Sequence, residues 1–245
     1  MIVSHNELVS TVEKAFLGAR RVCGEADVIA AMVADLQMFG LDGIRHFNNA
    51  NQRNSWGTDR AVTVTNHDEC CLNVNLHSSS VACHFPTVLD FAIDKMAVNK
   101  SISITLQRCH NPWFIHGELL KLAEKGKACR AVWTDYSEPK QVTYILNLGK
   151  IAPEIWYSHS SNLSTNLGGT VEIELSTNDF DIPRYTPEYT RHISSDKLLF
   201  TKEIAWRDGV FVEDAEWEQL KRQATLYLVE KSEHSARGAG ESVVS

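Results

Sequence analysis

A strand–helix–strand pattern in the middle of the sequence restricts the fold more than any other feature. Residues 102–106 alternate apolar and polar side chains, residues 115–125 have helical spacing before Gly126, and residues 129–133 again have the period of a strand. Two strands joined by a helix within about 35 residues form a right-handed parallel β-α-β crossover. The sequence therefore predicts a sheet that contains parallel strands and carries helices.

The N-terminal segment predicts a helical hairpin over residues 4–40. Ser4 and Glu7 have the spacing of a capping box at the start of the first helix. Apolar residues recur at helical spacing over residues 25–39, and Gly40 is placed to end this second helix. The following stretch, residues 40–57, is rich in Asn and Gly and predicts an irregular loop.

The remaining pattern predicts an α+β fold with a mixed sheet, one helical hairpin and one parallel crossover. No GxGxxG follows a strand, so the fold is expected to be non-Rossmann. A single domain is expected over residues 1–245, with the hairpin at 4–40, a sheet-containing body at 60–230 and a mobile tail at 231–245. Further strands are predicted at 61–65, 71–76, 142–148, 170–175 and 198–206, and further helices at 86–98, with Pro86 in the first turn, and at 214–227, capped by Asp214.

The charge balance excludes some partners. The chain of 245 residues has 24 Lys and Arg against 31 Asp and Glu, which gives a net charge of −7. Proteins that bind nucleic acid need a basic face, and the densest basic clusters here are the pairs Arg20-Arg21 and Lys221-Arg222. We therefore expect neither nucleic acid nor a membrane as a partner. Because the sequence shows no secretory signal and no CxxC pair among its six cysteines, we expect a cytoplasmic protein.

His46 and Asp42 form the first candidate site. They lie just after the hairpin, four residues apart in the predicted loop. An Asp that orients an imidazole is a common arrangement for a general acid. The alternative interpretation is an exposed loop histidine beside a turn aspartate, and the sequence leaves both open.

Polar residues at two strand ends form the second candidate site. Cys109 and His110 follow the first strand of the crossover, and Thr134 and Asp135 end its second strand. Ligands of open sheets bind beyond the carboxyl ends of parallel strands, so these residues are expected to line a pocket. The alternative is that both segments are ordinary turns that lead into the next element.

Metal binding and the common catalytic motifs are not indicated. The sequence has no Walker loop, no HExxH and no GxSxG. Two groups contain ligand-type residues without the paired spacing of a zinc site, so no metal is expected: His77, Cys83 and His84, and His67, Asp68 and Cys70.

Both ends of the chain resemble an uncharacterised bacterial family that is known only as a domain of unknown function. The resemblance lies in residues 8–19, in residues 24–43 with their GLDG turn, and in residues 227–240, which contain the Ser-Glu-x-Ser and Gly-Ala-Gly elements of the tail. It implies no activity.

A remote resemblance to the malate/L-lactate dehydrogenase family covers about residues 7–139. Residues 40–45 resemble the family's Gly-Ile-Asp-Ser-His-Gly, and residues 109–113 resemble its Ser-x-His-Phe-Gly segment. Residues 123–126 match a helix that ends in Ala-Glu-Lys-Gly, and residues 134–135 match the family's Thr-Asn. The matches follow one another in the family's order.

This second resemblance implies a homodimeric, NAD(P)-dependent reductase of small 2-keto acids or cyclic imines. The substrate would lie near Asp42 and His46, and His46, two residues after the family's donor position, would substitute as the proton donor if the loop is rearranged. Because Ile44 occupies the position of the family's proton-donating His, the alternative is an inactive relative that binds a metabolite or supports a partner subunit. The residues that would bind the NAD(P) cofactor are Cys109, His110, Thr134 and Asp135.

Overall fold

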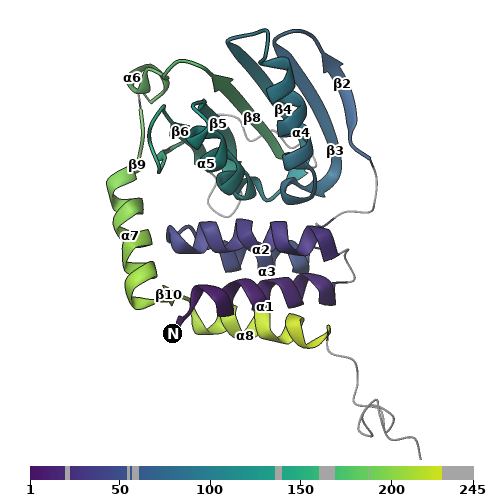
Figure 1. Ribbon diagram of the computed structural model, residues 1–245, viewed down its shortest axis with the longest axis vertical. Coiled ribbons are helices and arrows are strands. Elements are labelled where there is room, and N and C mark those ends of the chain that lie inside the picture. Colours follow the sequence, from purple (N-terminus) through teal and green to yellow (C-terminus); the bar gives the residue numbers. More distant parts are fainter. Residues whose placement is uncertain are drawn as a thin grey trace, which may run out of the picture.

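Helices and one large sheet lie in separate layers (Figure 1). The computed structural model describes residues 1–19, 23–53, 56, 61–135, 140–159, 169–186 and 188–227, without the side chains of Cys23, Asn66 and His67. The predicted mobile tail at 231–245 lies outside the described residues.

The helical layer is formed by α1 (His5–Gly18), α2 (Cys23–Met38), α3 (Gly43–Gln52) and α8 (Asp214–Thr225). The helices α1 and α2 are those of the predicted hairpin. Ser4 caps α1 as its spacing predicts, because its Oγ accepts a hydrogen bond of 3.1 Å from the backbone N–H of Glu7. The helices stack on one another, and α7 (Ser195–Asp208) runs along their side (Figure 1).

The sheet has eight strands among the described residues, in the order β2-β3-β4-β8-β5-β6-β7-β9. The pair β3–β4 is parallel and the other pairs are antiparallel. A separate pair, β1 (Ile2–Val3) with β10 (Val210–Phe211), joins the N-terminus to the segment before α8. The strands of the sheet are β2 (Thr63–His67), β3 (Cys71–Ser80), β4 (Ser101–His110), β5 (Ala128–Asp135), β6 (Lys140–Leu146), β7 (Glu154–His159), β8 (Gly169–Ser176) and β9 (Arg191–Ile193).

The predicted crossover is present, with one strand inserted. β4 and β5 are both antiparallel to β8, which lies between them, so they run parallel to each other. They are connected by the 3-10 helix η1 (Pro112–Ile115) and by α5 (His116–Glu124). A second parallel crossover, β3–α4–β4, uses α4 (Val81–Lys95) and joins adjacent strands.

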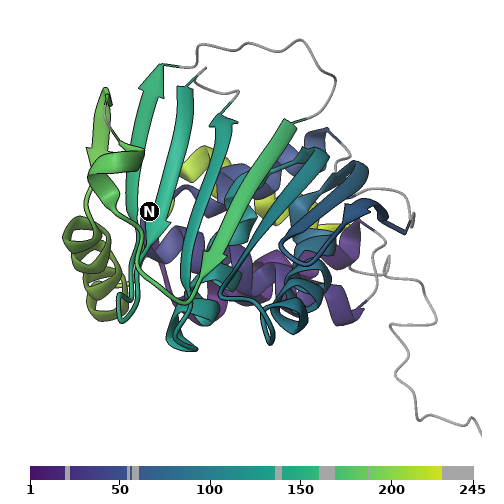
Figure 2. The ribbon, with the colours of Figure 1, turned by 90° about the horizontal axis from the view of Figure 1, so that it is seen from above.

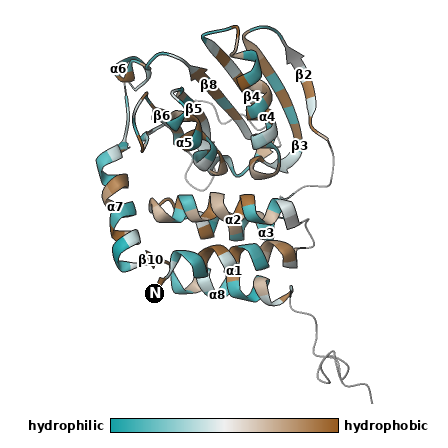
Figure 3. Cartoon of the chain, viewed as in Figure 1, coloured by the Kyte–Doolittle hydropathy of each residue, from teal (hydrophilic) through white to brown (hydrophobic). Residues whose placement is uncertain are grey.

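Helices cover one face of the sheet. Seen from above, the strands form a twisted layer in front of the helices (Figure 2). Along β4, Ile102, Ile104 and Leu106 are at most 1% exposed, whereas Ser101 and Ser103 are exposed. This is the alternation expected of a strand with one buried face, and Figure 3 shows it along β3 and β4.

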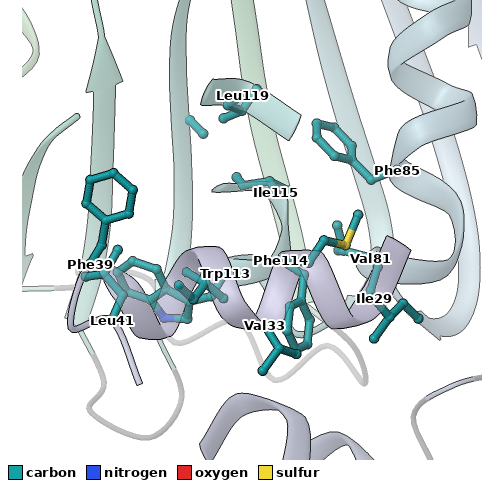
Figure 4. Close-up of a cluster of buried hydrophobic side chains, with 14 of the residues drawn as sticks. Ile29, Val33, Phe39, Leu41, Val81, Phe85, Trp113, Phe114, Ile115 and Leu119 are labelled. Atoms are coloured by element: carbon teal, nitrogen blue, oxygen red, sulfur yellow. The ribbon is translucent and has the colours of Figure 1, made fainter. Parts of the chain in front are cut away.

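The two layers share one continuous core. Side chains of α2 meet those of η1, α4 and α5, which lie against the sheet (Figure 4). Val33 of α2 lies near Phe114, and Phe85 and Leu119 face the same cluster. On the opposite face, Trp156 belongs to a smaller cluster that is covered by α6 (Ile182–Tyr185) and the residues before it.

The predicted loop at 40–57 is wrong over most of its length, because Gly43–Gln52 is the helix α3. Its Asn-rich composition indicates a loop, yet Ile44, Phe47 and Ala50 are buried on one side of it. Burial of this apolar face outweighs the weak helix propensity of Asn and Gly.

Two other boundaries differ from the prediction. The segment predicted as a strand at 198–206 is α7, which Ser194 caps with a 3.3 Å bond from the backbone N–H of Lys197. The helix predicted to start at Pro86 starts at Val81, because Ser80 caps it through a bond from the backbone N–H of Ala82.

We expect Gly43→Ala to lower the free energy of unfolding by about 2–3 kcal/mol, because an added methyl group is overpacked. A Cβ at this position would overlap with the carbonyl oxygen of Val33 and come within 3.0 Å of Leu36 Cβ. Gly24→Ala is the matched control, since a Cβ at Gly24 meets no atom of the described residues within 4 Å, and it should stabilise the protein by up to about 1 kcal/mol. Urea unfolding measures both, and equal stabilities of the two variants would contradict the account.

Candidate functional site

The start of α3 is fixed by contacts with α2 and β10. Asp42, the residue before α3, has left-handed backbone angles of φ 53° and ψ 40°. The backbone N–H of Ile44 donates to Gln37 Oε1 at 3.0 Å, and Gln37 Nε2 donates to the carbonyl of Phe211 at 2.9 Å. Together with the close packing of Gly43, these contacts set the rotation of α3 about its axis.

A second set of contacts ties α3 to the start of α8. The Arg45 guanidinium forms ion pairs with Glu213 at 2.9 Å, with Asp42 at 3.3 Å and with Glu216 at 3.5 Å. Asn48 Nδ2 donates to the Glu216 carboxylate at 2.7 Å and to its carbonyl at 2.9 Å. Arg45 is therefore engaged with three carboxylates of the protein itself.

The remaining face of α3 lines a pocket of about 370 Å³. Asp42, His46, Asn49 and Arg53 follow one another at the spacing of a single helix face, and all four line it. The other walls come from the ends of β4 and β5, the start of β8, and from β7 and β9. The structure brings all six residues proposed from the sequence to this pocket: Asp42, His46, Cys109, His110, Thr134 and Asp135.

Irregular backbone shapes the part of the pocket formed by β4. The registers of β3–β4 and β4–β8 shift near the end of β4, and His77, Ser78, Arg108 and Asn111 have positive φ angles between 50° and 67°. Such bulges redirect a strand and often lie next to functional sites. The sequence suggested that the ends of β4 and β5 are adjacent. In the structure, the start of β8 lies between them.

His46 lies against an aromatic wall. Its ring stacks on Trp113 with a centroid distance of 5.7 Å and an interplanar angle of 23°. Burial lowers the pKa of His46 to about 4, the Asp135 charge opposes this shift, and the Arg45 charge adds to it. The imidazole is therefore neutral at pH 7.

Asp42 does not hold the imidazole. Its carboxylate pairs with Arg45, and its link to His46 is the backbone hydrogen bond of 3.0 Å from the His46 N–H to the Asp42 carbonyl. Burial raises the pKa of Asp42, while Arg45 lowers it. Stacking on Trp113 limits the orientation of the imidazole instead of the Asp42 side chain.

Cys109 and His110 differ in their access to the pocket. The Cys109 thiol is buried and donates to the Gly169 carbonyl at 3.4 Å, and burial raises its pKa to about 12. It is a protonated, inert thiol at pH 7. His110 is half-buried, and burial and the nearby charge of Arg53 lower its pKa.

Two tryptophans form the floor of the pocket. Trp113 and Trp133 pack edge to face with their centroids 5.0 Å apart, and Trp113 Nε1 donates to the Asp135 carboxylate at 3.4 Å. Within the described part of the chain, the buried Nε1–H of Trp133 has no hydrogen-bond acceptor. Buried donors without partners are rare in native proteins, so this group is a candidate for a ligand contact.

The sequence patterns did not predict several of the residues that line the pocket. Asn49 and Arg53 could have been found from their helical spacing to His46, had α3 been predicted. Tyr157 and Arg191 lie on β7 and β9, which the sequence pattern did not reveal, and they are paired across these two strands.

Within the described ranges of the chain, no group of three or more His, Cys, Asp or Glu side chains lies close enough to hold a metal ion. No helix in the same ranges has the length and apolar character required to cross a membrane.

Comparison with known proteins gives a family match and a fold. Residues 3–83 match the model of a family described as "Protein of unknown function (DUF3726)". No curated protein matches the chain in sequence. The resemblance of the N-terminal region to an uncharacterised family is therefore confirmed.

Several solved structures with a similar fold are named dehydrogenases or reductases. A dehydrogenase from Sinorhizobium meliloti has a TM-score of 0.68 at 9% identity, over 91% of this chain and 99% of that one. Malate dehydrogenase from Entamoeba histolytica has a TM-score of 0.68 at 8% identity, over 93% and 98%. Delta1-piperideine-2-carboxylate reductase from Pseudomonas syringae pvar. tomato has a TM-score of 0.61 at 11% identity, over 91% and 99%. The chain thus has the non-Rossmann fold of the malate/lactate dehydrogenases, as its sequence predicts.

We expect His46 to make the stability of the protein depend on pH. The pKa of His46 is about 4 in the folded chain, below its unperturbed value of about 6.5. Because the unfolded chain binds more protons between these values, the His46 contribution is complete above pH ~6.5 and is lost as the pH falls toward 4.

Between pH ~7 and ~5, the wild type should lose about 2 kcal/mol more unfolding free energy than His46→Asn. Urea unfolding at the two pH values measures this difference. His116, whose pKa burial lowers to about 3, is present in both proteins and cancels. An equal loss in both proteins would show that His46 is not shielded from water.

Proposed function

We propose that this protein is a nicotinamide-dependent reductase of a small 2-keto acid or cyclic imine, with His46 as the proton donor. The observation that carries the proposal is the placement of the His46 imidazole, stacked on Trp113 in a pocket formed by α3 and the strand ends. The titles of proteins with this fold, among them a piperideine-2-carboxylate reductase, support the reaction class.

The change at the family's histidine position is compatible with this role. Ile44, which occupies that position, is 2% exposed and belongs to the core. His46, two residues later on α3, lines the pocket instead. A helix presents a different face two residues further on, so a shift of this size moves the imidazole from the core side to the pocket side.

The protonation of His46 depends on what binds beside it. A neutral imidazole is a poor proton donor, but an anionic substrate next to it favours the protonated form. Both ring nitrogens carry a proton in the protonated form, and the one that faces the substrate would transfer it. A general acid positioned in this way contributes about 10²–10⁴-fold to the rate.

The pocket residues fit a nicotinamide cofactor. The Trp133 Nε1–H, which has no acceptor among the described residues, suits the carboxamide oxygen of a nicotinamide ring, and Thr134 lies beside it in sequence at the end of β5. Arg53 and His110 would face the negative phosphates. When bound, the cofactor supplies the hydride that reduces the substrate carbon.

The alternative function is a metabolite-binding or partner-subunit protein without turnover. The ion pair of Asp42 with Arg45 and the neutral state of His46 favour it, because neither group is poised as an acid without a ligand. A cytoplasmic homodimer without a nucleic-acid partner is proposed under either function, from the resemblance and the acidic charge balance.

We expect the wild type to bind NADH or NADPH and to oxidise it with at least one small 2-keto acid or cyclic imine. His46→Asn should lower kcat by about 10²–10⁴-fold at pH ~7 and retain cofactor binding, because it removes only the proton donor. His5→Asn is the matched control, since the His5 ring lies 4.9 Å from the Trp206 ring at an angle of 31° and does not line the pocket.

Fluorescence titration measures cofactor binding, and cofactor oxidation measures turnover. Absence of binding to either nucleotide at millimolar concentration would overturn the cofactor assignment. Binding without turnover across a panel of keto acids and imines would favour the alternative function.

A further inference from the structure

The three arginines that line the pocket differ in whether carboxylates of the protein form ion pairs with them. Arg45 is bound to three carboxylates, as described above. Arg53 and Arg191 also line the pocket, and neither has a carboxylate of the described residues within ion-pair distance. An arginine that the protein leaves without a carboxylate in a pocket is available to an anionic ligand.

The two available arginines serve different parts of the pocket. The charge of Arg53 lowers the pKa of His110, so Arg53 lies toward the end of β4. The charge of Arg191 lowers the pKa of Asp42, the residue before α3, so Arg191 lies toward the start of α3. Arg191 and His46 line the same pocket.

The protein holds Arg191 in a defined position. In the β7–β9 pairing, Arg191 lies directly opposite Tyr157, and its guanidinium carbon is 5.1 Å from the centroid of the Tyr157 ring. Stacking on an aromatic face limits the guanidinium to few orientations and leaves its N–H edge available.

β9 is anchored through its other face as well. His192 stacks on Trp156 at 4.8 Å with an interplanar angle of 7°, and its Nε2 lies 2.6 Å from the Glu154 carboxylate. The backbone N–H of Thr190 donates to the Tyr157 carbonyl at 2.7 Å. A short edge strand with these contacts presents the Arg191 side chain from a fixed backbone.

We infer that Arg191 recognises the carboxylate of the substrate and so restricts the pocket to 2-keto or 2-imino carboxylates, excluding simple ketones and aldehydes. This inference rests on the proposed function. A guanidinium binds a carboxylate through two parallel N–H···O bonds, which fixes both its distance and its plane. In a 2-keto acid the carboxylate is bonded to the reacting carbon, so this contact also orients that carbon relative to His46.

The test compares a charged probe with a neutral one. Pyruvate and its neutral amide, pyruvamide, are titrated calorimetrically into the full chain in the presence of NAD⁺, so that no turnover occurs. Arg191→Met removes the charge and keeps much of the apolar stem, and Arg191→Lys keeps the charge without the planar fork. Arg184→Met is the matched control, because Arg184 also lies over a tyrosine ring, 5.6 Å from that of Tyr185, outside the pocket.

We expect Arg191→Met to weaken pyruvate binding by about 10–100-fold and to leave pyruvamide binding unchanged, since it removes a charge-assisted hydrogen bond. Arg191→Lys should give an intermediate loss, and Arg184→Met should give none. Unfolding in urea at the same midpoint shows that the variants are folded.

The outcomes separate this inference from the proposed function. A wild type that binds neither probe overturns the proposed function and the inference together. A wild type that binds pyruvate, with an Arg191→Met variant that binds it equally well or loses both probes equally, overturns the inference alone. A loss of NAD⁺ affinity with pyruvate affinity unchanged also overturns it, because Arg191 would then contact the cofactor.

Discussion

The close packing of α3 against the backbone of α2 at Gly43 is the contact on which the candidate site depends. Any Cβ at Gly43 would overlap with the Val33 carbonyl, so this approach requires glycine. The same approach lets Gln37 accept a hydrogen bond from Ile44 and brings Arg45 to the carboxylates of α8. Because α3 is held by contacts with α2 on one side and with α8 on another, its remaining face, which carries His46 and Asn49, points toward the strand ends.

The pocket that results has an electrostatic character unlike that of the whole chain. The protein carries a net charge of −7, yet three arginines line this pocket beside Asp42 and Asp135. Among the described residues, carboxylates form ion pairs with Arg45 and not with Arg53 or Arg191. Aromatic rings form part of the lining, and burial keeps the His46 imidazole neutral at pH 7. Arginine side chains beside aromatic rings favour a small organic anion as the ligand of such a pocket.

Periodicity revealed those parts of the fold whose patterns are unambiguous. The hairpin, the crossover and most of the strands follow from apolar spacing, because these segments bury one face against the core. It failed at α3, where Asn and Gly indicate a loop although tertiary packing imposes a helix, and at α7, where burial of Leu198 and Ala205 follows a helical period. Residues of the site near the family motifs could therefore be proposed, whereas Tyr157 and Arg191 depend on the pairing of β7 with β9, which no local pattern encodes.

The central claim is that α3 and the ends of the strands form a single ligand site. The most direct measurement follows the indole N–H signals of Trp113 and Trp133 and the ring signals of His46 by NMR while NADH and then pyruvate are added. The account predicts that NADH shifts the Trp133 signal and that pyruvate shifts the His46 signal, because these groups face the same hollow. If a ligand binds to saturation and leaves all three residues unchanged, the site lies elsewhere and the account is wrong.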